Sequence, residues 1–185
     1  MQIVEFVSRG RLSYEKWSDI LIHALSRLLS TSECPNFHIH IFGDGVYQSD
    51  FLSLSKQYPQ HITYYGRSTQ ATIFETARRC HYTLMPSRFL ETFGLTALES
   101  LSLGLPVIGY AKWGVEPFVM KSFRLAEYET LQTLGDSLWN MIIWLIRDFD
   151  NEQRNKDSAQ AQHIAATYSD TVRLKEFENI YTIDN

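Results

Sequence analysis

Two glutamates, Glu91 and Glu99, stand with seven residues between them in the stretch MPSRFLETFGLTALES, Met85–Ser100. A helix that opens near Gly94 would present free backbone N–H groups and the positive end of its dipole, which favour an anion. Carboxylates accept hydrogen bonds from sugar hydroxyls. A pyrophosphate between the two glutamates would leave one of them facing each end of the ligand. This arrangement predicts a nucleotide diphosphate that carries a sugar.

Two cations follow the first strand that the pattern predicts. Arg11 offers a planar fork of donors that suits phosphate oxygens, and Lys16 offers a point charge. Either residue alone would most often be a solvated surface charge. Arg11 and Lys16 indicate a phosphate site only if the fold places them beside the two glutamates.

Apolar runs and helical stripes alternate along the first 110 residues. This alternation predicts a Rossmann-like, doubly wound α/β fold, with a parallel sheet covered by helices on both faces. The expected strands are Ile3–Val7, Phe37–Phe42, Ile62–Tyr65, Tyr82–Met85 and Val107–Tyr110. The expected helices are a stripe over 17–28, then Phe51–Gln57, Ile73–Arg79 and Gly94–Leu103.

The alternation weakens after Val119. We expect a candidate sixth, edge strand at Phe123–Leu125 and then helices that fill residues 136–185. These are Asp136–Phe149, Asn151–Ala166 and Thr171–Tyr181, the last with Asp170 as its N-cap. The apolar run 138–146 is too short to span a bilayer and predicts a buried helix, or one that leans on a partner. We predict one domain over residues 1–185.

Ligands of open parallel sheets bind beyond the carboxyl ends of the strands, where the strand order reverses. In the common order, strands one, four and five are neighbours there. The loops that follow them carry Arg11 and Lys16, then Ser87 and Glu91, and finally Gly114 beside Lys112 and Trp113. We therefore expect these loops to converge on one crevice.

The composition narrows the classes of protein. The chain has 185 residues, is 44% hydrophobic and has a net charge of −4 without a basic run, so nucleic acid is not an expected partner. No signal peptide is visible, and Cys34 and Cys80 are interpreted as core thiols of a cytoplasmic protein. His38 and His40 share one face of a strand, but no third metal ligand is in view and no metal is expected.

Several motifs, in order, resemble the C-terminal, donor-binding domain of GT-B glycosyltransferases of family 4. They are GRLSYEK (Gly10–Lys16), FGDG (Phe42–Gly45), ITYYG (Ile62–Gly66), MPSRFLETFGLTALES and GLPVIGY (Gly104–Tyr110). The resemblance covers about Val7 to Val119.

The resemblance implies roles for the site residues. Arg11 and Lys16 would hold the donor pyrophosphate, Glu91 would bind hydroxyls of the donor sugar, and Glu99 would bind the ribose hydroxyls. The backbone at Phe93, Gly94 and Leu95 would cradle the sugar and phosphate, and Gly43 and Gly45 would border the nucleotide. Ser87 and Gly114 are the other expected donor contacts.

The family also implies a reaction. It would be a transfer of a hexose with retention of configuration, from GDP-mannose or next from a UDP-hexose, to a glycan or glycolipid of a bacterial-type envelope. The acceptor would be bound by an N-terminal domain that this chain lacks, and through that domain the enzyme could reach the inner face of the membrane. The chain alone is then expected to transfer no sugar. The alternative hypotheses for the function of this chain are a donor-binding subunit of a split enzyme and a non-catalytic nucleotide-sugar-binding or interaction module.

Two tryptophans depart from the family pattern. Trp17 stands where the family usually has glycine after the lysine, and Trp113-Gly114 replaces a Gly-Gly pair. Glu116-Pro117 also inverts the usual Pro-Glu. We expect Trp113 to narrow the sugar pocket or to occlude it.

Overall fold

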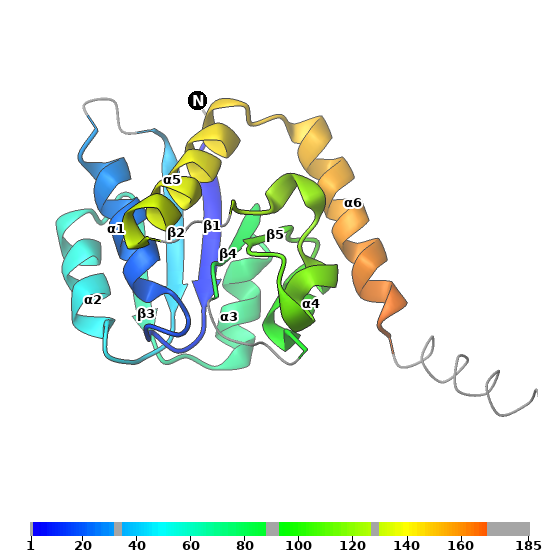
Figure 1. Cartoon of the computed structure of the whole chain (residues 1–185), viewed down its shortest axis with the longest axis horizontal. Coiled ribbons are helices and arrows are strands. Elements are labelled where there is room, and N and C mark those ends of the chain that lie inside the picture. Colours follow the sequence, from blue (N-terminus) through cyan, green and yellow to red (C-terminus); the bar gives the residue numbers. More distant parts are fainter. Residues whose placement is uncertain (1, 32–34, 88–92, 127–129, 170–185) are drawn as a thin grey trace, which may run out of the picture.

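The computed structural model describes residues 2–31, 35–87, 93–126 and 130–169. Its centre is a parallel sheet of five strands in the order β3-β2-β1-β4-β5 (Figure 1). The strands are β1 (Val4–Arg9), β2 (Phe37–Phe42), β3 (Ile62–Gly66), β4 (Tyr82–Met85) and β5 (Val107–Gly109). The α-helices are α1 (Ser18–Leu29), α2 (Gln48–Gln57), α3 (Gln70–Ala77), α4 (Leu95–Ser102), α5 (Leu131–Arg147) and α6 (Asn151–Thr167), and the 3-10 turns are η1 (Trp113–Phe118) and η2 (Lys121–Phe123).

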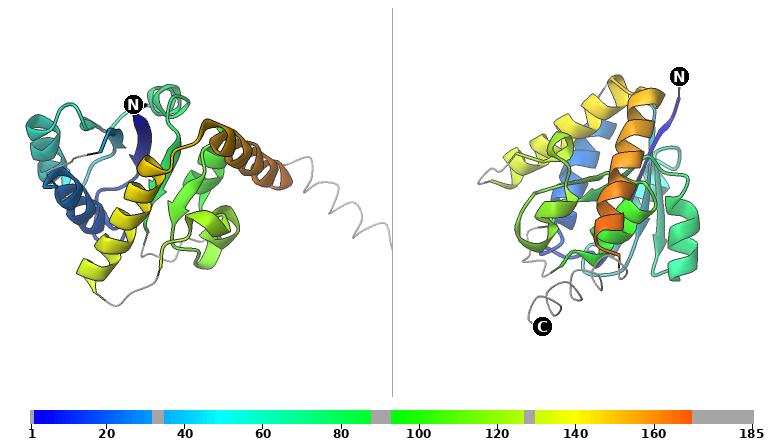
Figure 2. Two further views of the ribbon diagram at one scale, coloured as in Figure 1. Left: turned by 90° about the horizontal axis from the view of Figure 1, so that it is seen from above. Right: turned by 90° about the vertical axis from the view of Figure 1, so that its right-hand side faces the viewer.

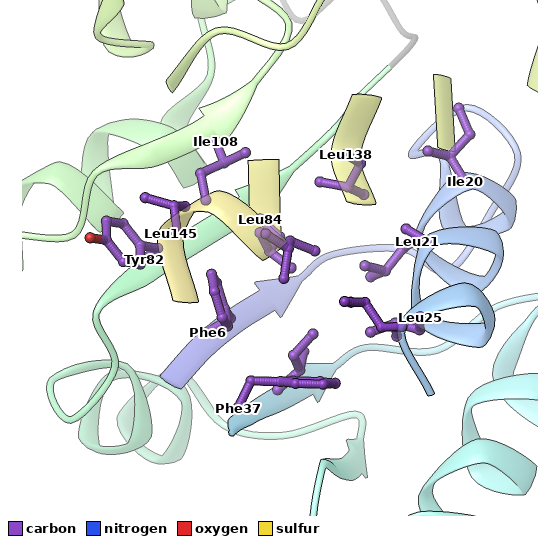
Figure 3. Close-up of a cluster of buried hydrophobic side chains, with 14 of the residues drawn as sticks. Phe6, Ile20, Leu21, Leu25, Phe37, Tyr82, Leu84, Ile108, Leu138 and Leu145 are labelled. Carbon is purple, nitrogen blue, oxygen red and sulfur yellow. The ribbon is translucent and has the colours of Figure 1, made fainter. Parts of the chain in front are cut away.

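Helices cover both faces of the sheet, as Figure 2 shows from two directions. Phe6 of β1 points to the large core beneath α1 and α5, which includes Leu25 and Leu138 (Figure 3). Val7, the next residue, packs on the other face against Ala77 of α3. Successive side chains of a strand point to opposite faces, so the doubly wound prediction is confirmed by this alternation and by the strand order.

Helix α5 contains the apolar run that the sequence left open between two interpretations. Leu134, Leu138, Ile142 and Ile146 are buried against the sheet and α1. Trp144 lies on the opposite side of the helix and is 46% exposed. The run is therefore a buried, amphipathic helix. Among the helices that the structure describes, none is both long enough and apolar enough to cross a bilayer.

The expected sixth strand was wrong in extent. Only Arg124 forms a β-bridge, with Gly109 of β5, and Leu125 donates a backbone hydrogen bond to the Gly109 carbonyl at 2.9 Å. The reason is local, because the 3-10 turn η2 occupies residues 121–123 and the Arg124 side chain turns back to the Val119 carbonyl. The expected helix Thr171–Tyr181 and its cap Asp170 lie outside the described residues.

Element boundaries moved where short-range polar contacts decide them. Thr69 accepts a hydrogen bond from the Thr72 N–H and starts α3 earlier than its apolar residues indicate. Thr130 and Thr133 form a capping box that begins α5 well before Asp136. Strand β1 continues two residues beyond Val7, so Arg9 belongs to the sheet and not to the following loop. This last shift changes the site.

Candidate functional site

A pocket opens at the carboxyl ends of β1 and β4, next to the N-terminus of α4. Arg11 and Lys16 line it from the loop after β1, Ser87 from the loop after β4, and Thr96 from the first turn of α4. Strands β1, β4 and β5 are neighbours, as expected. The loops after β1 and β4 therefore converge on one crevice with the N-terminus of α4, as expected. The third expected loop, after β5, does not contribute Lys112, Trp113 or Gly114 to the lining of this pocket.

The loop that carries Arg11 is held by the loop after β2. The Gly10 N–H donates to the Phe42 carbonyl at 3.1 Å, and the Leu12 N–H donates to the Asp44 carbonyl at 2.8 Å. A Cβ on Gly43 would lie 1.8 Å from the Gly10 oxygen, and one on Gly45 would lie 2.3 Å from the Leu12 oxygen. Both glycines are thus needed for the close approach of two backbones, which positions the Arg11 loop beside the pocket.

Arg11 and Lys16 are close enough for their charges to interact. The pKa of Lys16 is lowered, first by burial of its ammonium and then by the positive charge of Arg11. Both effects oppose the charged form of the lysine. An anion bound between the two cations would reduce their repulsion, which is the electrostatic behaviour of a phosphate site.

Helix α4 begins at Gly94, which has φ +73 and is buried. A Cβ there would meet Val115 at 3.2 Å and Phe118 at 3.4 Å, and the Gly114 oxygen at 3.5 Å. Gly114 therefore lies against the start of α4, and Leu95 at the first helical position is 64% exposed. The Ala97 and Leu98 N–H groups donate to the Gly94 carbonyl at 2.9 and 3.1 Å, so the N–H groups of Leu95 and Thr96 are the ones that the start of the helix offers to an anion.

Phe93 has a different surrounding from the one that a donor-binding side chain would need. Its ring packs edge-on against Phe118 at 5.7 Å and against Tyr168 at 6.2 Å. The side chain thus belongs to the small core between α4, η1 and α6. The backbone role implied for this residue stays a prediction.

Glu99, the fifth residue of α4, is paired in the structure. Its Oε2 lies 2.8 Å from Nη1 of Arg9, and its Oε1 accepts a hydrogen bond from Nε2 of Gln70 at 3.2 Å. Arg9 also donates to the Thr96 carbonyl at 2.9 Å and is almost buried. Burial lowers the pKa of Arg9, and the charge of Glu99 offsets part of this effect.

Sequence reasoning gave Arg9 no role. The signal was present, because Glu5, Val7 and Arg9 alternate along β1 and so share the face on which α3 and α4 pack. If the strand is taken to end at Val7, Arg9 falls in the following loop and does not count among the residues of this face. Extending it to Arg9 places the guanidinium under α4, in reach of Glu99.

Both tryptophans that depart from the family pattern have backbone conformations that favour glycine. Trp17 has φ 58 and Trp113 has φ 52, and in the described part of the chain they are the only non-glycine residues with positive φ. Trp17 is buried and its ring meets Tyr110 edge-on, with 4.1 Å between centroids. Trp113 is 47% exposed, with the Lys112 ammonium 5.7 Å from its ring.

Some expected residues cannot be placed. Glu91 and Cys34 lie outside the described residues, so the role implied for Glu91 stays a prediction. Cys80 is buried as expected, and burial raises the pKa of its thiol to about 12.

Comparison with known proteins gives the class. The family model "Glycosyl transferases group 1" matches residues 4–161, and the chain belongs to this family. The glycogen synthase of Hydrogenovibrio crunogenus is 29% identical over 115 residues, which are 62% of this chain and 23% of that protein. The chain thus spans about a quarter of the length of this relative.

Two solved structures share the fold. The pneumococcal O-GlcNAc transferase GtfA, in complex with UDP and GlcNAc, superposes with a TM-score of 0.76 at 20% identity, over 95% of this chain and 35% of that one. The lipopolysaccharide outer core galactosyltransferase WaaB gives a TM-score of 0.70 at 22% identity, over 96% of this chain and 48% of that one. The fold is that of a GT-B glycosyltransferase domain.

Proposed function

We propose that this chain is the nucleotide-sugar-binding domain of a retaining hexosyltransferase. The observation that carries the proposal is the pocket that brings Arg11 and Lys16 beside the N-terminal turn of α4. A pyrophosphate placed there would meet two cations and the N-terminal end of the helix, with the N–H groups of Leu95 and Thr96. The membership in the group 1 family supports the same reading.

The chemistry assigned to the chain is stabilisation of a leaving diphosphate. Arg11 and Lys16 would neutralise the charge that develops on the pyrophosphate oxygens as the bond to the sugar breaks. Glu99 would accept hydrogen bonds from the ribose, because each carboxylate oxygen has a second lone pair beyond those used by Arg9 and Gln70. Glu91 would hold hydroxyls of the transferred sugar. We propose no metal in this pocket.

For the donor, we propose GDP-mannose first and a UDP-hexose second. The first choice rests on the sequence VIGYAKWG, Val107–Gly114, and the second is supported by the UDP of the GtfA complex. The acceptor proposed is a glycan or glycolipid of the envelope, which rests on resemblance alone. The whole enzyme would act in the cytoplasm, at the inner face of the membrane, with an N-terminal domain that binds the acceptor.

The test is a calorimetric and thermal-shift titration of the chain with GDP, UDP and ADP and their hexose forms. A ligand at about 100 times its dissociation constant should stabilise the fold by about 2.7 kcal/mol. Arg11→Ala should abolish the shift. Arg78→Ala is the charge-matched control, because Arg78 ends α3 before the amino end of β4 and does not line the pocket. A shift that survives in Arg11→Ala would refute the assignment of the pocket.

Transfer itself is tested separately. The purified chain, supplied with the donor that binds and a glycolipid acceptor, should release no nucleotide above the rate of spontaneous hydrolysis. Measured transfer by the chain alone would refute the need for a second domain. Binding of no nucleotide at all would leave two interpretations: a site that closes only with the second domain, or a non-catalytic interaction module in which Trp113 closes the sugar pocket.

A further inference from the structure

A second cluster of chemically reactive side chains lies across the three central strands of the sheet, nearer to their amino ends than the donor pocket. Glu5 of β1, His40 of β2 and Cys80, just before β4, each offer one ligand atom, and the three atoms lie within 4.8 Å of one another. Glu5 and Cys80 stand at the amino ends of their strands, whereas the donor pocket lies at the carboxyl ends. The donor site uses none of these three side chains.

His40 is oriented as a metal-binding imidazole usually is. Its Nδ1 lies 3.0 Å from the hydroxyl of Tyr65, and its Nε2 lies 3.2 Å from Oε2 of Glu5. In this structure Nε2 faces an acceptor and donates its N–H to Glu5. A metal would take the place of this proton, and Nδ1 would then carry the ring proton and donate it to the Tyr65 hydroxyl. Tyr65 is itself held in place, because its ring stacks on Phe42 with 4.3 Å between centroids.

His38 differs from His40, although the two rings are neighbours with 4.7 Å between centroids. Its Nδ1 lies 3.0 Å from the Gln60 carbonyl and its Nε2 lies 2.8 Å from the Thr63 hydroxyl. Both nitrogens of His38 are therefore engaged with β3 and the turn before it. The two histidines do not form a chelating pair. The candidate ligands beside His40 are Glu5 on β1 and Cys80 in the turn before β4.

We propose that Glu5, His40 and Cys80 bind a divalent ion of the Zn²⁺ class. A thiolate with an imidazole and a carboxylate is a donor set that suits Zn²⁺ and Co²⁺ and not Mg²⁺ or Ca²⁺. Two tetrahedral ligands at about 2.0–2.1 Å from Zn²⁺ stand roughly 3.3 Å apart, which matches the 3.2 Å between His40 and Glu5. Water would fill the fourth position, and the Cys80 thiol would lose its proton to solvent as the metal binds.

The surroundings allow an ion to enter and to stay. The Glu5 side chain is 33% exposed and the His40 side chain 14% exposed, so the site is reached from solvent past the carboxylate. Cys80 is buried, which places the sulfur on the inner side of the ion. Arg79 is the neighbouring cation that opposes metal binding, and the Glu5 carboxylate offsets it.

A bound ion would link three adjacent strands. His40 lies on β2, Glu5 on β1 and Cys80 at the entrance to β4, and these strands are consecutive in the sheet. The ion would thus act as a structural cross-link nearer to the amino ends of the strands, away from the nucleotide at their carboxyl ends. Its loss should lower thermal stability without changing the affinity for a nucleotide.

The test is a titration of the chelator-treated full chain with Zn²⁺ and, separately, with Co²⁺. We expect one equivalent of Zn²⁺ to bind and raise the Tm, and Co²⁺ to give the visible bands of a tetrahedral site and a near-ultraviolet thiolate charge-transfer band. Cys80→Ser should remove the charge-transfer band. His40→Gln and Glu5→Gln should each weaken Zn²⁺ binding by at least about tenfold, since even outer partners of a ligand change affinity by that factor.

Two matched variants separate this site from adventitious binding. Cys34→Ser keeps Cys80 as the one remaining thiol and should leave the charge-transfer band unchanged. His38→Gln removes the neighbouring histidine and should leave Zn²⁺ affinity within about twofold of the wild type. Circular dichroism of the metal-free Glu5→Gln variant, which keeps an acceptor for His40, checks that the fold is intact.

The proposal is overturned by any of three results. The wild-type chain could give no thiolate band with Co²⁺. The band could vanish in Cys34→Ser and persist in Cys80→Ser. His38→Gln could weaken Zn²⁺ binding as much as His40→Gln does.

Discussion

Arg9 and Glu99 form an ion pair, 2.8 Å from Nη1 to Oε2, between the last residue of β1 and the middle of α4. Gln70 of α3 holds the other carboxylate oxygen at 3.2 Å. The glutamate that the family resemblance assigns to the ribose is thus fixed by two side chains of this domain. Pre-orientation of a ligand-binding carboxylate reduces the entropy lost when the nucleotide binds.

This pair should be energetically coupled. In a cycle of Arg9→Met, Glu99→Gln and the double variant, we expect a coupling energy of about 1–2 kcal/mol from urea unfolding, because Arg9 is nearly buried while Glu99 is 36% exposed and partly screened. The surface pair Lys156–Glu152 is the matched control and should give at most about 0.5 kcal/mol. Equal coupling in the two pairs would show that burial of Arg9 adds nothing.

Two facing glycines, Gly10 after β1 and Gly43 after β2, provide a second test. Gly10 and Gly43 have similar φ values, +139 and +129, but a Cβ on Gly10 meets nothing within 4 Å while one on Gly43 overlaps the Gly10 oxygen. Gly10→Ala should therefore cost about 1–2 kcal/mol of backbone strain, and Gly43→Ala at least about 2 kcal/mol more. Chemical denaturation measures both, and similar losses would contradict the close approach of the two loops.

The fold was accessible from the sequence because its signals are local or periodic. The alternation of apolar runs with helical stripes predicts the parallel sheet, and the order of its motifs predicts which strands adjoin the pocket. Arg11, Lys16 and Ser87 are found together there as expected. These residues lie in loops that follow the ends of strands, and Gly and Pro mark such ends in the sequence.

The features that the sequence did not predict depend on contacts between segments far apart in the chain. The Arg9–Glu99 pair joins residues 90 positions apart and depends on where β1 ends, within two residues. The ligand set around His40 needs β1 and the turn before β4 beside β2, although His38-His40 alone is visible in the sequence. The sixth strand failed because three residues of suitable type were instead used by a 3-10 turn and one bridge.

The two tryptophans with positive φ reverse a usual order of stability. At most buried positions, glycine is a worse replacement than alanine because of its backbone entropy. At Trp17, we expect Trp17→Ala to lose about 4 kcal/mol through the cavity, and Trp17→Gly to be about 1 kcal/mol more stable than Trp17→Ala because glycine relieves the left-handed backbone. Trp113 should show the same order with a smaller total loss, since its side chain is 47% exposed.

Leu21 is the control for this order. It is buried within helix α1, so Leu21→Gly should be less stable than Leu21→Ala by about 1 kcal/mol. Thermal or urea unfolding of the six variants gives the comparison. If the glycine variants of Trp17 and Trp113 were also less stable than the alanine variants, the positive φ values of these tryptophans would carry no strain.

We expect Lys16 to lower the stability of the fold and to raise its affinity for the nucleotide. Burial and the charge of Arg11 lower its pKa in the folded state from 10.5, so the charged lysine destabilises the fold at neutral pH. Lys16→Met should then be more stable than the wild type by about 0.5 kcal/mol in urea, while its affinity for the nucleotide falls. A variant that lost stability and kept its affinity would contradict the role of Lys16 in the pocket.

The sign of the pH dependence follows from the same shift. Between the lowered pKa of the folded state and 10.5, the unfolded chain binds more protons at Lys16 than the folded chain, so the wild type gains stability relative to Lys16→Met as the pH rises. The advantage of the variant should be full at pH 7 and should disappear above about pH 10.5. Urea unfolding of both proteins between pH 7 and pH 10.5 measures the difference, in which the other titrating groups cancel. A constant difference over this range would show that the Lys16 ammonium is as well solvated in the fold as in the unfolded chain.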